Sequence, residues 1–165
     1  FMEIVFEKLP KNLQEMKELE YASLAKPEYA PALYLAAVKA YVEDKEAAYE
    51  MIRFLQGPRE FTGMDKQFLK DRMCDKADYI VESYFKGSTV QNNYTPTLPY
   101  TVSLTENPYS YSVEGYVKLF LRSAGADSER PVVVRLKPST GQWFLWEQSS
   151  VLMGIRIPVA KDPWA

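Results

Sequence analysis

Aromatic and basic side chains occupy alternate positions of several segments in the second half of the chain. Alternate residues of a β-strand point to the same face, so these side chains would gather on one face of a sheet. Aromatic rings stack on planar groups, and cations attract anions. This mixed face is therefore a candidate binding platform for a planar or anionic ligand, or for single-stranded nucleic acid. Its residues are Tyr116, Lys118, Phe120, Arg122, Arg135, Phe144 and Trp146.

The mixed face also has a purely structural interpretation. The long stems of Lys and Arg can cover aromatic rings while their charges reach water. A half-covered sheet face would then need no ligand. The structural interpretation is the favoured one, and the binding interpretation stays open beside it.

Loops rich in Asn, Tyr and Pro form a second set of candidates. Such side chains can donate hydrogen bonds to a ligand or can hold their own turns, and the structural role is favoured. We expect Arg130 to pin this loop region through Asp127. The loop candidates are Asn93, Tyr94, Tyr109 and Asp127.

Carboxylates cluster between residues 65 and 82, where a divalent metal is conceivable. Lysine and arginine side chains are interleaved with them, which favours a solvated face of ion pairs, so we predict no metal site. The carboxylates are Asp65, Asp71, Asp75, Asp78 and Glu82.

Other chemistry is restricted by what the chain lacks. It has no histidine and a single cysteine, which excludes histidine-dependent nucleophile systems and zinc–thiolate cages within one chain. We expect Cys74 to be a small core residue rather than a nucleophile. No glycine-rich phosphate loop is present. We therefore predict no catalytic residues and no cofactor.

The elements that must position these residues divide the chain in two. Helical spacing of apolar residues predicts helices over about 13–20, from Pro27 to about Tyr41, over 45–56 and over 62–74, with a short helical turn within 78–85. Asn12, Asp44 and Thr62 are the expected N-caps. The short β-favouring sequence at residues 3–7 predicts an edge strand.

From Tyr100 onward apolar residues recur at every second position, which is the spacing of a β-strand. Strands are predicted over 100–105, 115–122, 132–137 and 142–147, with a last extended piece at 155–157. A four-residue hairpin loop at 138–141 would pair Leu136 with Trp143, Val134 with Leu145, Arg135 with Phe144 and Val133 with Trp146.

The sequence thus predicts an α+β fold in a single domain of 165 residues. Residues 1–86 are mainly helical, residues 87–99 are a connection, and residues 100–160 are mainly β. About four helices pack on the aliphatic face of an antiparallel meander of four to five strands, and a sheet curled around the helices is a variant. The chain begins at Phe1 rather than Met, which suggests that a segment upstream is missing.

The overall composition sets limits on partners. The formal charge is −2 and 47% of the residues are apolar, so no global charge favours nucleic acid or anionic membranes. No apolar run approaches the ~18 residues of a membrane span. One cysteine suits a reducing compartment. We expect a protein or an anionic or planar ligand as partner, no membrane, and we disfavour nucleic acid.

Several motifs resemble a bacterial family of unknown function whose members are stand-alone domains of this size. The resemblance extends from about Leu9 to Ala165 and implies a cytoplasmic protein, but no activity and no catalytic residues. The motifs that carry it are Asn92-Asn93-Tyr94-Thr95-Pro96, Asn107-Pro108-Tyr109-Ser110-Tyr111, Gly125-Ala126-Asp127-Ser128 and the run from Lys137 to Glu147.

These observations favour a non-enzymatic binding or interaction module. One alternative is a small enzyme or ligand-binding pocket that uses Asp, Tyr and Arg, and a deep pocket lined by these residues would favour it. Another alternative is a self-associating structural protein that pairs through the strand at residues 3–7.

Overall fold

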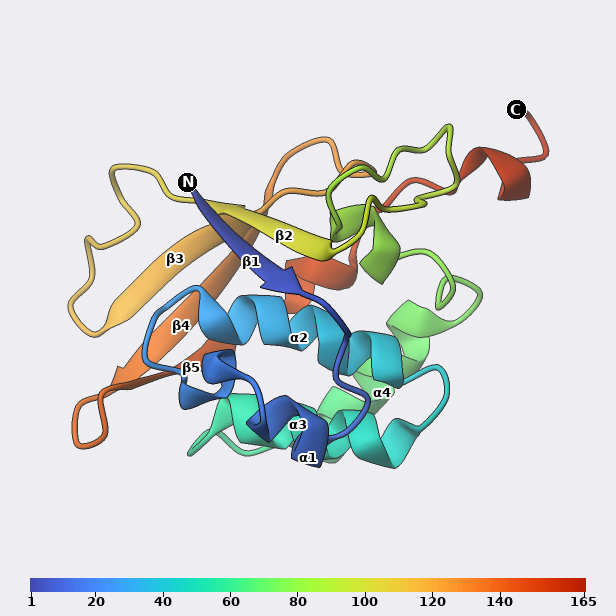
Figure 1. The fold of residues 1–165 in the computed structure, drawn as a ribbon. Coiled ribbons are helices and arrows are strands. Elements are labelled where there is room, and N and C mark those ends of the chain that lie inside the picture. Colours follow the sequence, from blue (N-terminus) through green and yellow to red (C-terminus); the bar gives the residue numbers. More distant parts are fainter.

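The computed structural model describes residues 1–165 and confirms the predicted α+β fold. Four helices of the first half are followed by four strands, and a fifth strand comes from the N-terminus (Figure 1). The helices are α1 (Leu13–Lys17), α2 (Tyr29–Ala40), α3 (Lys45–Gln56) and α4 (Gly63–Met73). The strands are β1 (Met2–Phe6), β2 (Tyr100–Thr105), β3 (Tyr116–Leu121), β4 (Arg130–Lys137) and β5 (Gln142–Glu147).

The three predicted helix caps are present. Asn12 accepts from the backbone N–H of Glu15, and Asp44 accepts from that of Ala47, so each supplies an acceptor to a free N–H of the first turn. Thr62 and Asp65 form a reciprocal capping box at the start of α4. The starts of α1, α3 and α4 are therefore encoded locally in the sequence.

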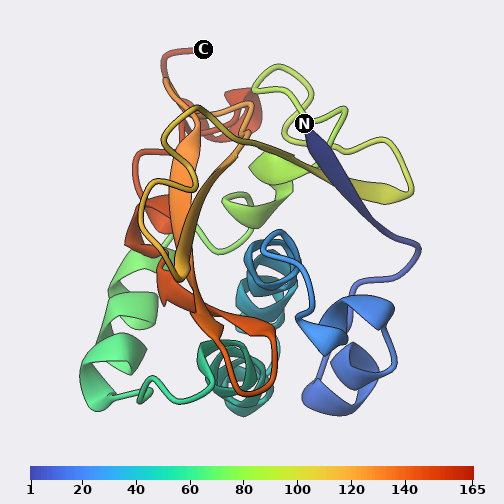
Figure 2. The same ribbon diagram turned by 90° about the vertical axis from the view of Figure 1, so that its left-hand side faces the viewer.

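Helix α2 lies at the centre of the molecule. Every residue from Ala30 to Val38 is buried, because the helix is apolar on all sides and packs against α3, β4 and β5. The sheet curls around this helix, as the view in Figure 2 shows. Buried residues of both halves form one cluster of 36 side chains, so the two halves share a core.

The sheet is wholly antiparallel, in the order β1-β2-β3-β4-β5. Its aliphatic face, which includes Val117, Leu119 and Val134, is buried as predicted. In the β4–β5 hairpin, Leu136 pairs with Trp143, Val134 with Leu145 and Arg135 with Phe144.

One pairing in this hairpin was predicted wrongly. Val133 lies opposite Glu147 rather than Trp146, because a β-bulge lies between Val133 and Val134 in the register. Trp146 is left as an extra residue without a partner on β4. Alternation from the hairpin loop cannot reveal such a bulge.

Both outer edges of the sheet are partly closed. The Tyr21 hydroxyl accepts from the Val5 N–H at 3.3 Å and donates to the Val5 carbonyl at 3.0 Å on β1. On β5, the Trp143 N–H donates to the Leu24 carbonyl, and the Arg59 guanidinium donates to the Trp146 carbonyl. These contacts occupy groups that could otherwise pair with another strand.

The predicted helical turn within 78–85 is confirmed as a 3-10 helix at Val81–Tyr84, whereas three smaller predictions differ from the structure. The first helix ends at Lys17. Residues 155–157 form no strand. Cys74 is exposed rather than part of the core, because α4 ends at Met73 and Cys74 is its C-cap.

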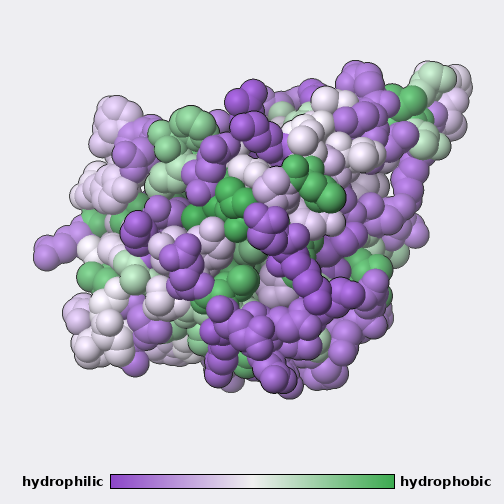
Figure 3. All heavy atoms as spheres, in the orientation of Figure 1, coloured by the Kyte–Doolittle hydropathy of each residue, from purple (hydrophilic) through white to green (hydrophobic).

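The surface in Figure 3 varies across the molecule. Hydrophilic residues dominate over α1 and α3, whereas residues of intermediate hydropathy gather on the left, where the β2–β3 and β4–β5 connections lie. None of the helices combines the length and apolar character that crossing a membrane requires.

Gly57 is expected to be essential for the junction between α3 and β5. It has φ +56°, and a Cβ there would collide with the Phe144 ring. We expect Gly57→Ala to lower the free energy of unfolding by about 3 kcal/mol, from backbone strain and overpacking together. Urea unfolding measures this change.

The matched control is Gly141→Ala in the hairpin loop. Gly141 also has positive φ, at +73°, but a Cβ there meets nothing within 4 Å. Only backbone strain remains, so a loss of about 1 kcal/mol is expected. Equal losses in the two variants would contradict the role given to the Phe144 contact.

Candidate functional site

Three residues of the mixed face meet on the outer side of the sheet. The rings of Tyr116 and Trp146 are edge to face at 5.8 Å between centroids. The Arg135 guanidinium lies 5.4 Å from the Tyr116 ring centroid and 4.8 Å from that of Trp146. Trp146 is 38% exposed, so this cation–aromatic cluster remains open to solvent.

A shallow groove extends from this cluster toward the loop that precedes β3. It has a volume of about 470 Å³ and is lined by Tyr109, Tyr116, Lys118 and Trp146 among others. Tyr109 is 76% exposed. The structure thus brings one loop candidate together with three residues of the mixed face.

Two mixed-face residues take other positions. Phe120 lies beneath Lys118, whose Nζ is 5.9 Å from the ring centroid. Arg122 lines a separate hollow with Lys86 and Ser88. The face therefore does not form one continuous platform, because Arg122 lines a hollow apart from the other residues.

A pocket of about 300 Å³ lies at the edge strand β5. We call it the basic pocket. The lining residues that matter here are Pro58, Arg59, Arg135, Lys137, Phe144 and Trp146. None of the three cations is in an ion pair, and no carboxylate lines the pocket. Its charge and its aromatic rings suit a planar anion.

The position of Arg59 follows from the elements on either side. Gly57 ends α3 with a positive φ, and its missing side chain lets the turn lie directly on Phe144. Arg59 then reaches the carbonyl of the bulge residue Trp146. Arg59 consequently lies between the basic pocket and a second pocket.

The second pocket is also about 300 Å³, and we call it the tyrosine pocket. Its polar lining residues are Tyr34, Gln56, Arg59, Asp65, Glu147, Gln148 and Ser149. Tyr34 is only 2% exposed, and its hydroxyl makes no hydrogen bond within the chain. Burial raises the pKa of Tyr34 well above its ordinary value.

Glutamine side chains connect the two pockets. The Gln56 Oε1 atom accepts from Arg59 Nη2 and from Gln148 Nε2, each at 3.2 Å. Gln56 Nε2 donates to the Glu60 carbonyl at 3.3 Å. Gln148 Oε1 is buried without a partner.

Glu147 is a carboxylate that its neighbours stabilise in the charged form. The Ser149 hydroxyl and backbone N–H both donate to Glu147 Oε1, at 2.6 and 3.0 Å. These hydrogen bonds hold the pKa of Glu147 below its ordinary value.

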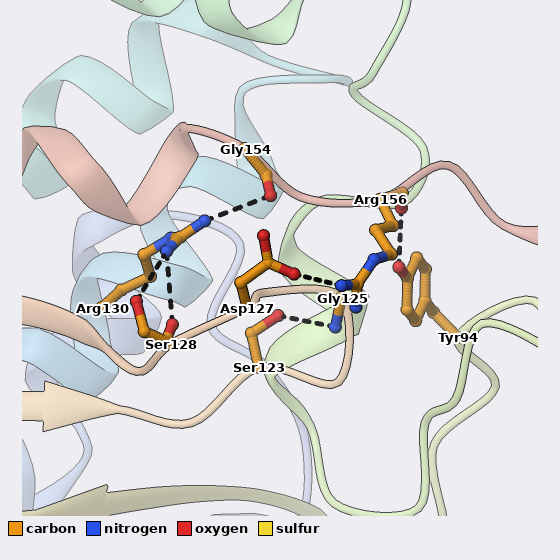
Figure 4. A network of polar contacts seen from close by, with 8 residues as sticks. All are labelled: Tyr94, Ser123, Gly125, Asp127, Ser128, Arg130, Gly154 and Arg156. Atoms are coloured by element: carbon orange, nitrogen blue, oxygen red, sulfur yellow. Dashed lines mark hydrogen bonds and ion pairs between the residues drawn. The ribbon is translucent and has the colours of Figure 1, made fainter.

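The remaining loop candidates contact the chain's own C-terminal segment, in part as Figure 4 shows. The Tyr94 hydroxyl donates to the Arg156 carbonyl at 2.6 Å, and Asn93 Oδ1 accepts from the Ala160 N–H at 2.8 Å. Asp127 pairs with Arg156. These contacts correspond to the structural role that the sequence favoured.

The expectation that Arg130 pins the loop through Asp127 is wrong. Arg130 instead donates to the carbonyls of Gly154 and Ser128, at 3.1 and 3.2 Å (Figure 4). It also donates to the Met153 carbonyl at 3.1 Å. Arg156, which is distant in sequence, takes the carboxylate. Arg130 was expected because it is nearer to Asp127 in the sequence than Arg156 is.

The acidic residues of the first half have separate partners. Glu82 pairs with Lys39, Asp78 pairs with Lys161, and Asp71 accepts from Gln67. Asp65 serves the α4 capping box. The carboxylates are thus distributed among different local contacts.

Comparison with known proteins identifies the family. A family model described as "Domain of unknown function (DUF6935)" matches residues 8–159, nearly the whole chain. The chain belongs to the DUF6935 family. No curated protein and no solved structure matches it. The predicted resemblance to a family of unknown function is confirmed.

Sequence reasoning missed several residues that line the two pockets of this DUF6935 domain. Tyr34, Gln56, Arg59 and Gln148 were not among the candidates. The sequence contained a signal for Tyr34, because it is the only polar side chain between Ala30 and Val38. The other three depend on how α3 and β5 meet, which periodicity does not indicate.

Two buried tyrosines allow a direct test of the free hydroxyl in the DUF6935 domain. The Tyr84 hydroxyl donates to the Val151 carbonyl at 2.6 Å, whereas that of Tyr34 has no partner. We expect Tyr84→Phe to lower the free energy of unfolding by about 1 kcal/mol. Tyr34→Phe should leave it within about 0.5 kcal/mol or raise it, because no hydrogen bond is lost.

Urea unfolding of both variants beside the wild type gives the comparison. An equally large loss for Tyr34→Phe would mean that its hydroxyl has a partner in the folded chain.

Proposed function

We propose that this domain is a non-enzymatic binding module of the bacterial cytoplasm that takes a planar anionic group in the basic pocket. One observation carries the proposal. Arg59, Arg135 and Lys137 line one pocket without carboxylate partners, next to the rings of Phe144 and Trp146. Unpaired cations beside aromatic rings favour a ligand that supplies both a negative charge and a π-face.

The geometry of the basic pocket fits this ligand class in size. A volume of about 300 Å³ is at the lower end for small-molecule sites. Arg59 is held by the Trp146 carbonyl and Gln56, so one cation is preorganised. The Arg135 guanidinium is held beside the Trp146 ring.

Binding is favoured over acid–base catalysis by the titratable groups nearby. A general acid or base works best with a pKa near the working pH. Burial shifts the pKa of Tyr34 upward, and hydrogen bonds from Ser149 shift the pKa of Glu147 downward. Both shifts move the pKa of the group further from neutral pH, which supports a binding role for the two side chains.

Self-association through β1 is less favoured. The Tyr21 hydroxyl already occupies both the N–H and the carbonyl of Val5 at that edge. A second copy would have to displace Tyr21 to pair along the whole strand.

The proposal is tested by titrating the protein with AMP, GMP, CMP and UMP at low salt while its amide NMR shifts are recorded. We expect saturable shifts at Arg135, Phe144 and Trp146, and tighter binding of AMP than of adenosine because the phosphate adds the charge. Arg135→Gln should weaken AMP binding about tenfold, as expected for the loss of a charge-assisted hydrogen bond.

Arg122→Gln is the matched control, since Arg122 lies in a different hollow. It should leave AMP binding unchanged. Pocket resonances that no nucleotide moves, or an equal loss in Arg122→Gln, would refute the proposed site.

A further inference from the structure

The tyrosine pocket contains hydrogen-bonding groups that the folded chain leaves unused. Tyr34 belongs to α2, whose other residues from Ala30 to Val38 are apolar and buried. No hydrogen bond of the folded chain engages its hydroxyl, whereas the hydroxyls of Tyr84 and Tyr94 each donate to a carbonyl at 2.6 Å. Because Tyr34 lines the pocket, a molecule inside the pocket can supply the missing partner.

The orientation of Gln148 leaves an acceptor rather than a donor unused. Arg59 Nη2 donates to Gln56 Oε1, which fixes the Gln56 amide with its oxygen on that side. Gln148 must therefore present Nε2 to the same oxygen, at 3.2 Å. Its own Oε1 is left buried and unpartnered, in a side chain that is 8% exposed. A ligand that satisfies this atom has to be a donor.

The charges of the pocket also favour a donor-rich ligand. Asp65 and Glu147 line it together with a single cation, Arg59, which leaves a net negative charge. Arg59 already donates to the Trp146 carbonyl and to Gln56.

Each carboxylate keeps one oxygen for such a ligand. Asp65 uses Oδ2 for Thr62, at 2.7 and 3.2 Å, and Glu147 uses Oε1 for Ser149. Asp65 Oδ1 and Glu147 Oε2 are not used in these contacts. The unused polar groups of the pocket are thus mainly hydrogen-bond acceptors, and the pocket carries a net negative charge.

We propose that the tyrosine pocket binds the ammonium group of a primary amine. Its three N–H donors match Gln148 Oε1, the Tyr34 oxygen and a carboxylate oxygen of Asp65 or Glu147. The aliphatic stem lies against Phe61 and Phe68, which also line the pocket. This site is separate from the basic pocket and has the opposite charge preference.

The first experiment titrates the protein with n-butylammonium, with n-butanol and butyrate as probes of matched size. The butylammonium should shift the Gln148 side-chain amide and the backbone amides of residues 147–149 saturably. A dissociation constant of about 1 mM suits so small a probe. Absence of a saturable shift, or equal shifts with butanol, would overturn the proposal.

A second probe separates a free amine from a lysine side chain of a partner protein. Nα-acetyl-lysine methylamide carries the same ammonium group behind a peptide backbone. Binding at least as tight as that of butylammonium assigns the pocket to a lysine side chain, and weaker binding assigns it to a free amine. Both results require the shared ammonium site.

Variants identify the groups that bind. Tyr34→Phe should weaken butylammonium binding about tenfold, whereas Tyr84→Phe should leave it unchanged because Tyr84 lies outside the pocket. Glu147→Gln alters an exposed residue and should also weaken binding several-fold. If Tyr34→Phe or Glu147→Gln binds butylammonium as tightly as the wild type, the assigned contacts are wrong.

The two proposed sites can fail independently. Arg135→Gln should leave butylammonium binding unchanged, and Tyr34→Phe should leave AMP binding unchanged. Loss of one ligand's binding therefore reports on one pocket only.

Discussion

The rest of the structure depends on the burial of a helix that is apolar on all sides. Nine consecutive residues of α2, from Ala30 to Val38, are removed from water, which no single neighbouring layer could achieve. The sheet therefore curls around α2, while α3 packs against it (Figure 2). The alanines of α2 allow neighbours to approach closely, and hydrophobic burial on every side provides the driving force.

This central helix also explains why a polar site can exist so deep in the molecule. Tyr34 is carried into the core by the residues around it, at a position where α3, α4 and the end of β5 meet. The Tyr34 residue is only 2% exposed, and the apolar packing around it belongs to the core cluster that both halves of the chain share.

The meeting of α3 with β5 creates two pockets of opposite character. Gly57 lets the turn after α3 touch Phe144, the bulge exposes the Trp146 carbonyl, and Arg59 joins the two. On one side of Arg59 the lining is basic and aromatic, and on the other side it is acidic around Tyr34 and Gln148. The same contact that closes the β5 edge thus separates two electrostatic environments about one arginine. The chain carries little net charge, so the charge differences on its surface are local.

The sequence by itself determined the local elements. These elements depend on residues that are close together in the chain, and the structure confirms them. They are the helix caps at Asn12, Asp44 and Thr62, the change from helical to strand periodicity near Tyr100, and the hairpin loop at 138–141. It also indicated that Arg135, Phe144 and Trp146 share one side of the sheet. Only the tertiary structure decided that Arg122 lies apart, that Cys74 is exposed, and that Arg59, Gln56, Gln148 and Tyr34 adjoin β5. The physical reason is that periodicity specifies which face a residue takes, whereas the bulge at Val133–Val134 and the curl of the sheet around α2 specify which distant residues that face meets.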